Sequence, residues 1–170
     1  MEFIQVTSPE DFRTVEIYSS YCTTFPECER RSEVQFQDLF SRNNVKIYAV
    51  LDELKTVGYL IIWELSTGVF VEHFEIFSQF RSQKYGSEII SKLFRDYSNI
   101  ILEAEPENLN EDSKRRIAFY QKNGFAVIDE NYIQPSYGEG KQSLNLWLLS
   151  NWKPENVLRI KEEIYDIVYR

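Results

Sequence analysis

Residues 78–87 read Ser-Gln-Phe-Arg-Ser-Gln-Lys-Tyr-Gly-Ser, and they lie where the hydrophobic pattern of the chain changes its period. The preceding residues 69–76 are rich in Val, Phe and Ile, which is typical of a β-strand. From Lys84 to Tyr97 the apolar residues recur instead at helical spacing: Tyr85, Ile89, Ile90, Leu93 and Phe94. The stretch therefore predicts a loop that joins a strand to the N-terminus of an amphipathic helix.

Such a loop has the chemistry of an anion site. The first turn of a helix presents backbone N–H groups that lack internal partners, and the helix dipole adds partial positive charge. A diphosphate would suit this position. Gly86 would let the backbone approach a ligand closely, while Arg81 and Lys84 would add positive charge. On these residues alone, an ordinary strand-loop-helix corner with solvated charges is the simpler interpretation.

The rest of the chain alternates between strand and helix patterns, without repeats or a linker. We expect strands at residues 2–6, 46–51, 57–65, 69–76, 100–104, 125–128 and 144–149. We expect helices at residues 8–21, 32–41, 84–97, 111–121 and 154–169. Residues 130–142, which contain Pro135, Gly138 and Gly140, are expected to form a loop. This order predicts one α/β domain over residues 1–170, in which helices flank both faces of a mixed sheet.

The strand at residues 69–76 contains the only histidine of the chain. Alternate residues of a strand face opposite sides of the sheet, so we expect Glu72 to share a face with Phe70 and Phe74. His73 is then expected on the opposite face, as a packed imidazole rather than a base.

The composition restricts the classes of function. The chain has 19 Lys and Arg against 27 Asp and Glu, a net charge of -8, so we expect neither nucleic-acid nor anionic-membrane binding. One His and two Cys without metal-ligand spacing predict no metal site, and Cys22 and Cys28 are expected to be reduced thiols. The chain shows neither a signal-peptide pattern nor an apolar run of about 20 residues, so we expect a soluble, cytoplasmic protein.

Three stretches carry a resemblance. Residues 81–86 read Arg-Ser-Gln-Lys-Tyr-Gly, residues 101–105 read Ile-Leu-Glu-Ala-Glu, and residues 115–125 read Arg-Arg-Ile-Ala-Phe-Tyr-Gln-Lys-Asn-Gly-Phe. The first resembles the signature Arg/Gln-x-x-Gly-x-Gly/Ala of the GNAT acetyltransferases, and the others resemble their second motif: a strand, a helix ending in Tyr, then Gly-Phe. The resemblance covers most of the chain and is firmest over residues 57–128. Lys84 replaces the first signature glycine, Ser113 stands where the family often has Asn, and residues 106–112 lengthen the preceding loop.

The resemblance implies the GNAT fold and acetyl-CoA as co-substrate. In that fold the strand before the signature splays from its parallel neighbour, and the pantetheine arm lies in the gap beside it. The diphosphate would lie on backbone amides of the signature loop. The residues implied in cofactor binding are Phe74, Glu75, Ile76, Arg81, Ser82, Gln83, Lys84, Tyr85, Gly86, Ser87, Ser113 and Tyr120.

The implied reaction is attack of an amine on a thioester, which needs a base for the amine and a proton for the leaving thiolate. The resemblance assigns the proton donor to Tyr120, and a buried core tyrosine is the alternative. Glu103 and then Glu72 are the candidate bases, with a water relay as the alternative. A backbone N–H near Phe74 or Glu75 would stabilise the oxyanion.

The acceptor is expected to be a primary amine of a small molecule or peptide. Glu105 has the strand parity of Glu103 and could bind an ammonium group. The Phe25-Pro26 segment and residues 132–141 are expected to form substrate walls. Two other functions stay open: a non-catalytic acyl-CoA sensor, and an interaction module with the same fold. The protein is expected to be a monomer or a homodimer.

Overall fold

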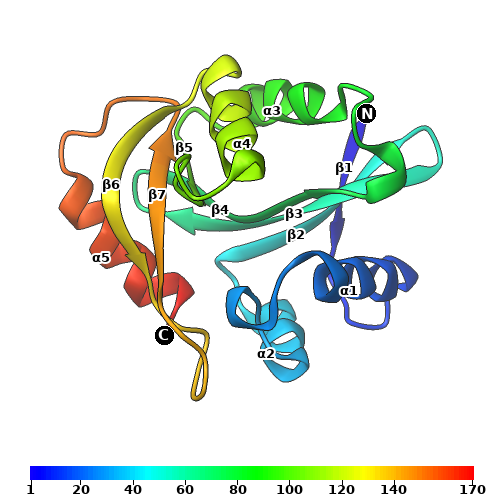
Figure 1. The fold of residues 1–170 in the computed structure, drawn as a ribbon. Coiled ribbons are helices and arrows are strands. Elements are labelled where there is room, and N and C mark those ends of the chain that lie inside the picture. The colour runs from blue at the N-terminus through cyan, green and yellow to red at the C-terminus, as the bar shows by residue number, and fades with distance from the viewer.

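A computed structural model describes all residues of the chain, Met1–Arg170. Seven strands form one mixed sheet in the order β1-β2-β3-β4-β5-β7-β6, and five α-helices surround it (Figure 1). The strands are β1 Glu2–Val6, β2 Val45–Asp52, β3 Lys55–Leu65, β4 Gly68–Ile76, β5 Ile100–Ala104, β6 Ala126–Gln134 and β7 Leu144–Ser150. The helices are α1 Phe12–Thr24, α2 Glu33–Asp38, α3 Tyr85–Asp96, α4 Glu111–Lys122 and α5 Val157–Val168, with 3-10 turns at Glu27–Glu29, Leu39–Ser41 and Ser78–Phe80. The predicted α/β class with a mixed sheet is confirmed.

The helices cover both faces of the sheet. Helices α3 and α4 lie on one face, and α1, α2 and α5 lie on the other (Figure 1). The core beneath α3 and α4 includes Ile89 and Ile117, whereas the core on the opposite face includes Ile17, Phe36 and Ile164. Each helix thus buries one apolar stripe against the sheet, as the helical spacing predicts. No helix of the protein combines the length and the apolar character needed to cross a membrane.

Two helices begin three or four residues later than the sequence pattern predicts. The helix expected from residue 8 begins at Phe12, because the side chain of Asp11 accepts a hydrogen bond from the backbone N–H of Arg13 and caps the helix. Likewise α5 begins at Val157 instead of residue 154, because Asn156 caps it. In both cases a side-chain cap, and not the nearby proline, sets the first turn.

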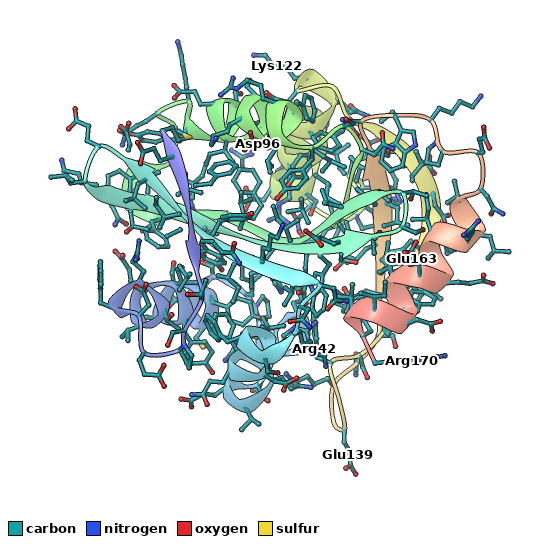
Figure 2. The ribbon with its side chains drawn as sticks, turned by 180° about the vertical axis from the view of Figure 1, so that it is seen from behind. Arg42, Asp96, Lys122, Glu139, Glu163 and Arg170 are labelled. Atoms are coloured by element: carbon teal, nitrogen blue, oxygen red, sulfur yellow. The ribbon has the colours of Figure 1, made fainter.

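Strand β6 extends to Gln134, so the prediction of a loop over residues 130–142 is wrong for residues 130–134. Its pairing with β7 shifts register between Val127 and Asp129, and again between Asp129 and Tyr132. These irregularities interrupt the two-residue alternation by which a strand is recognised in a sequence. The loop that does follow β6 extends away from the sheet, and Glu139 lies at its tip (Figure 2).

Strands β4 and β5 are the only parallel pair, and they part after three residues. Val69, Phe70 and Val71 pair with Ile100, Ile101 and Leu102. Beyond this point β4 continues to Ile76 with pairing only to β3, while β5 continues to Ala104 with pairing only to β7. The sheet is therefore open between the two strand ends, and backbone groups on the facing edges are unpaired there.

A bulge in β4 lies at the start of this opening. On β3, Ile61 pairs with His73 and the next residue, Ile62, pairs with Val71, so Glu72 is the extra residue. Glu72 and His73 consequently both face α1 and α5, whereas Phe74 packs in the core beneath α3 and α4. The predictions that Phe74 shares a face with Glu72, and that His73 lies opposite Glu72, are wrong for this reason.

Candidate functional site

A cavity of about 800 Å³ lies at the opening between β4 and β5. On one side it is lined by Gly86 of α3 and Tyr120 of α4, and on the other by Thr24 and Phe25 at the end of α1. Because α1 and α4 cover opposite faces of the sheet, the cavity passes through the sheet at the splay. A ligand entering from one face can thus meet a second ligand entering from the other.

The edge of β4 forms one wall of this cavity through Phe74, Glu75 and Ile76. Their backbone groups on the β5 side have no partner strand. The Glu75 side chain is buried against α1, where Oε1 accepts hydrogen bonds from Ser20 and Thr24, and Oε2 has no partner. The open edge is therefore suited to an extended, amide-bearing ligand that pairs as an added strand would.

The loop before α3 has the unpaired amides that an anion site needs. Ser82, Gln83 and Lys84 make no hydrogen bond through their backbone N–H groups, and the first turn of α3 has no side-chain cap. Ser82 and Lys84 both have positive φ, 63° and 69°. Lys84 therefore adopts the left-handed conformation that explains why glycine is the usual residue at this signature position.

The side chains of this loop do not all reach the cavity. Arg81, Ser82, Lys84, Tyr85, Gly86 and Ser87 line it, but Gln83 does not. The Gln83 side chain instead donates to the backbone carbonyl of Gln79. Arg81 is exposed, donates through Nε to the Ile76 carbonyl, and has Nη2 3.6 Å from Glu75 Oε1. Its guanidinium therefore stays at the mouth of the cavity.

Gly86 has a packing role in addition to the expected close approach to a ligand. It is buried, and a Cβ atom there would lie 2.9 Å from Cζ of Phe119 and 3.3 Å from Cδ1 of Ile76. The absence of a side chain thus brings the start of α3 against α4. Ser113 is buried in the first turn of α4, where it is hydrogen-bonded to Asn110 and Glu105, and it does not line the cavity.

Tyr120 projects from α4 into the cavity lining with 7% of its surface exposed. Its ring packs against Phe119 and Phe125, and its hydroxyl has no hydrogen-bond partner within the chain. Burial raises the pKa of Tyr120 to about 12, with a small opposing effect from Arg116. The phenol is therefore protonated at neutral pH and has a proton free to donate.

Glu103 of β5 is half-buried, with part of its side chain facing the cavity. Its Oε1 accepts hydrogen bonds from Tyr169, at 2.8 Å, and from Gln134, while Oε2 is enclosed without a partner. Burial raises the pKa of Glu103 to about 7, although the side chains of Tyr169, Gln134 and Tyr132 act to lower it. A carboxylate with this pKa can accept a proton and release it again near neutral pH.

Glu72 is also a cavity residue, but its carboxylate is fully engaged. It forms an ion pair with Arg31 at 2.9 Å, and it accepts hydrogen bonds from Trp63 Nε1 at 2.6 Å and the Tyr137 hydroxyl at 2.8 Å. Burial acts to raise the pKa of Glu72, but Arg31 and the hydrogen-bond donors outweigh it and hold the pKa below its ordinary value. The two predicted bases thus have opposite environments: Glu103 has no cationic partner, whereas the charge of Glu72 is neutralised by Arg31.

His73 lies beside this ion pair, outside the cavity lining. Its Nε2 is 3.3 Å from the Tyr21 hydroxyl, and its ring meets the edge of Phe25 with centroids 4.5 Å apart. Burial lowers the pKa of His73 to about 4, so the imidazole is neutral at neutral pH. This arrangement is that of a packed core histidine.

The regions expected to form substrate walls lie on the α1 side of the opening. Phe25 lines the cavity, whereas Tyr132 and Tyr137 are buried behind Glu103 and Glu72. Glu105 forms an ion pair with Arg116 at 2.8 Å. Sequence reasoning missed Arg31, Gln134 and Tyr169, because these residues are distant in the sequence from the carboxylates that they contact.

Comparisons with known proteins indicate the family and the fold of the chain. The sequence profile described as the Acetyltransferase (GNAT) family matches residues 14–125, more than half of the chain. No curated protein matches the sequence. A solved structure from Bacteroides thetaiotaomicron, of a protein assigned to the GNAT acetyltransferases, has a TM-score of 0.93 at 26% identity and covers 99% of this chain and 98% of its own.

Two more distant structures share the fold. One is a GNAT family acetyltransferase from Elizabethkingia anophelis with acetyl-CoA bound, with a TM-score of 0.60, 14% identity, and coverage of 88% of this chain and 95% of that chain. The other is an aminoglycoside 6'-N-acetyltransferase complexed with coenzyme A, with a TM-score of 0.62, 13% identity, and coverage of 88% and 96%.

Proposed function

Because the chain belongs to the GNAT acetyltransferase family, we propose that it transfers an acetyl group from acetyl-CoA to a primary amine of a small molecule or peptide. One observation carries this proposal. The cavity at the splay of β4 and β5 is lined by Tyr120, a protonated phenol, and by Glu103, a carboxylate with a pKa of about 7. These are the two proton-transfer groups that amide formation from an amine and a thioester needs.

The residues around the cavity fit acetyl-CoA. The unpaired edge of Phe74, Glu75 and Ile76 would hold the pantetheine arm, and the free amides before α3 would hold the diphosphate. Arg81 and Lys84 would add positive charge at the same mouth of the cavity. Gln83 and Ser113 would contribute only through the backbone or through packing, because their side chains lie outside the lining.

The reaction places one proton transfer on each side of the sheet. Acetyl-CoA supplies the thioester carbonyl that the neutral amine attacks. Glu103 accepts the proton that the amine loses, directly or through a water molecule, and Tyr120 donates a proton to the departing sulfur. A C–N bond forms, a C–S bond breaks, and the products are an N-acetyl amide and free CoA. Glu72 supports the opening through its ion pair with Arg31, and we assign it no proton transfer.

The acceptor would reach the opening from the face that carries α1. Carboxylates prevail on this side, and Phe25 supplies an apolar surface beside them. An amine that carries a positive charge before its deprotonation would be attracted to this environment.

The experiment is a thiol-release assay with acetyl-CoA and a panel of primary amines, with CoA binding measured by calorimetry. We expect Tyr120→Phe and Glu103→Gln to bind CoA normally and to lower kcat by about 10²-fold or more. Tyr48→Phe is the matched control, because that hydroxyl bonds only to Tyr97, far from the cavity. CoA binding without turnover of any amine by the unmodified protein would favour an acyl-CoA sensor instead.

A further inference from the structure

Two residues distant in the sequence, Gln134 at the end of β6 and Tyr169 just after α5, meet at the Glu103 carboxylate. Tyr169 donates its hydroxyl proton to Glu103 Oε1 at 2.8 Å, and Gln134 Nε2 donates to the same oxygen. Gln134 Nε2 also lies 3.1 Å from the Tyr169 hydroxyl, so the three groups form a closed triangle. The orientation of one carboxylate oxygen is thus set from two elements other than its own strand.

The Tyr169 ring is itself held in place. It packs on the ring of Tyr137 with centroids 5.3 Å apart, and the Tyr137 hydroxyl donates to Glu72. The backbone carbonyl of Val168, the preceding residue, accepts a hydrogen bond from Arg31 at 2.8 Å. The end of α5 is therefore anchored to the same ion pair that supports the opening of the sheet.

The Glu103 carboxylate has no cationic partner. The charged or titratable groups that act on it are Tyr132 of β6, Tyr169 after α5 and Glu72 of β4, and Glu72 is itself paired with Arg31. Tyr137 and Tyr165 are close enough to be affected by its charge. The charge of Glu72 opposes the ionisation of Glu103, so only hydrogen bonds from neutral side chains favour that ionisation. A carboxylate held in this way is sensitive to the loss of a single donor.

From these contacts we infer that Tyr169, assisted by Gln134, is a positioning residue that keeps the Glu103 carboxylate oriented and ionised for proton acceptance. The inference rests on the proposed function in that it takes Glu103 as the base. Tyr169 acts through Glu103 and transfers no proton to substrate. Its effect is accordingly on the ionisation of Glu103 and on the pH dependence of turnover.

The test compares Tyr169→Phe with Tyr165→Phe. Tyr165 lies on α5 one turn earlier, and its hydroxyl donates to the backbone carbonyl of Ile133 instead of a carboxylate. The Glu103 carboxyl is titrated by ¹³C NMR on glutamate-labelled protein, and its resonance is assigned by its loss in Glu103→Gln. We expect Tyr169→Phe to raise the pKa of Glu103 by about one pH unit, since a hydrogen bond to a charged group is worth that much. Tyr165→Phe should leave it unchanged.

The pH profile of thiol release separates the inference from the proposed function. If the acidic limb moves with the NMR pKa in Tyr169→Phe, both are supported. If the NMR pKa rises while the limb stays, the inference about the carboxylate stands and Glu103 is not the base. An unchanged NMR pKa overturns the inference whatever the activity. Should Tyr169→Phe fold poorly by circular dichroism, Gln134→Met removes the second donor and must shift the pKa in the same direction.

Discussion

The ion pair between Arg31 and Glu72 gives the sharpest stability prediction. Arg31 is 5% exposed and Glu72 is 6% exposed, and their charged atoms lie 2.9 Å apart. The substitution Glu72→Gln keeps the shape of the side chain but leaves the guanidinium buried without a counter-charge. Breaking a buried pair in this way costs about 3–5 kcal/mol. For a chain of this size, that corresponds to a fall in melting temperature of roughly 6–20 °C.

The assay is thermal and urea unfolding followed by circular dichroism, with Glu64→Gln as the matched control. Glu64 lies on the neighbouring strand β3 and pairs with Lys46, but its side chain is 47% exposed. Solvent screens that pair, so its loss should cost about 1 kcal/mol or less. The double variant Arg31→Met with Glu72→Gln should recover part of the loss, because it removes the uncompensated charge as well.

Two results would refute this reasoning. Equal destabilisation by Glu72→Gln and Glu64→Gln would mean that the buried pair has no more effect on stability than an exposed one. A Glu72→Gln protein that melts normally but has lost all turnover would show that Glu72, and not Glu103, accepts the proton.

Three further predictions concern the mouth of the cavity and Glu103. Arg81→Ala should weaken CoA binding in calorimetry and reduce its salt dependence, whereas the neighbouring Gln83→Ala should do neither, because that side chain points to Gln79. In urea unfolding, the free energy of unfolding of Lys84→Gly should exceed that of Lys84→Ala by about 1 kcal/mol, because only glycine relieves the strain at a φ of 69°. Equal free energies of unfolding would contradict the left-handed assignment. Burial raises the pKa of Glu103 to about 7 from an ordinary 4.5. The contribution of the protonated group to the free energy of unfolding is therefore fully present below pH 4.5 and is lost as the pH rises through 7. Glu103→Gln cannot ionise and should therefore gain stability relative to the unmodified protein between pH 5 and pH 8, and a constant difference in melting temperature would disprove the raised pKa.

The elements of the fold could be predicted from local patterns, because each depends on a short repeat of apolar residues. The strand-loop-helix at 69–97 is an example: α3 begins at Tyr85, one residue after the predicted start, and buries Ile89, Ile90 and Leu93. The first residues of α1 and α5 were less predictable, since Asp11 and Asn156 compete with nearby prolines as start signals. A cap is decided by one side-chain hydrogen bond, which composition does not reveal.

The residues of the candidate site could be predicted only where they lie within one contiguous sequence motif. Tyr120 and the loop before α3 belong to contiguous motifs, and they line the same cavity. The residues that contact the Glu72 and Glu103 carboxylates belong to no such motif. Arg31 reaches Glu72 across 41 positions of sequence, and Tyr169 reaches Glu103 across 66. No periodic pattern links such residues, because their proximity results from the order of strands in the sheet.

The bulge at Glu72 connects the failed prediction of strand faces to the site itself. Strict alternation along β4 would place Glu72 and His73 on opposite faces, and nothing in residues 71–74 marks the extra residue, since such a bulge does not require glycine. The last pair between β4 and β5 is Val71 with Leu102, immediately before the bulge. A bulge bends its strand and increases the local twist. The same residue therefore turns β4 away from β5, which opens the sheet, and brings His73 to the face on which Glu72 meets Arg31 beside the opening. The irregularity that the sequence conceals is thus the feature that creates the cavity.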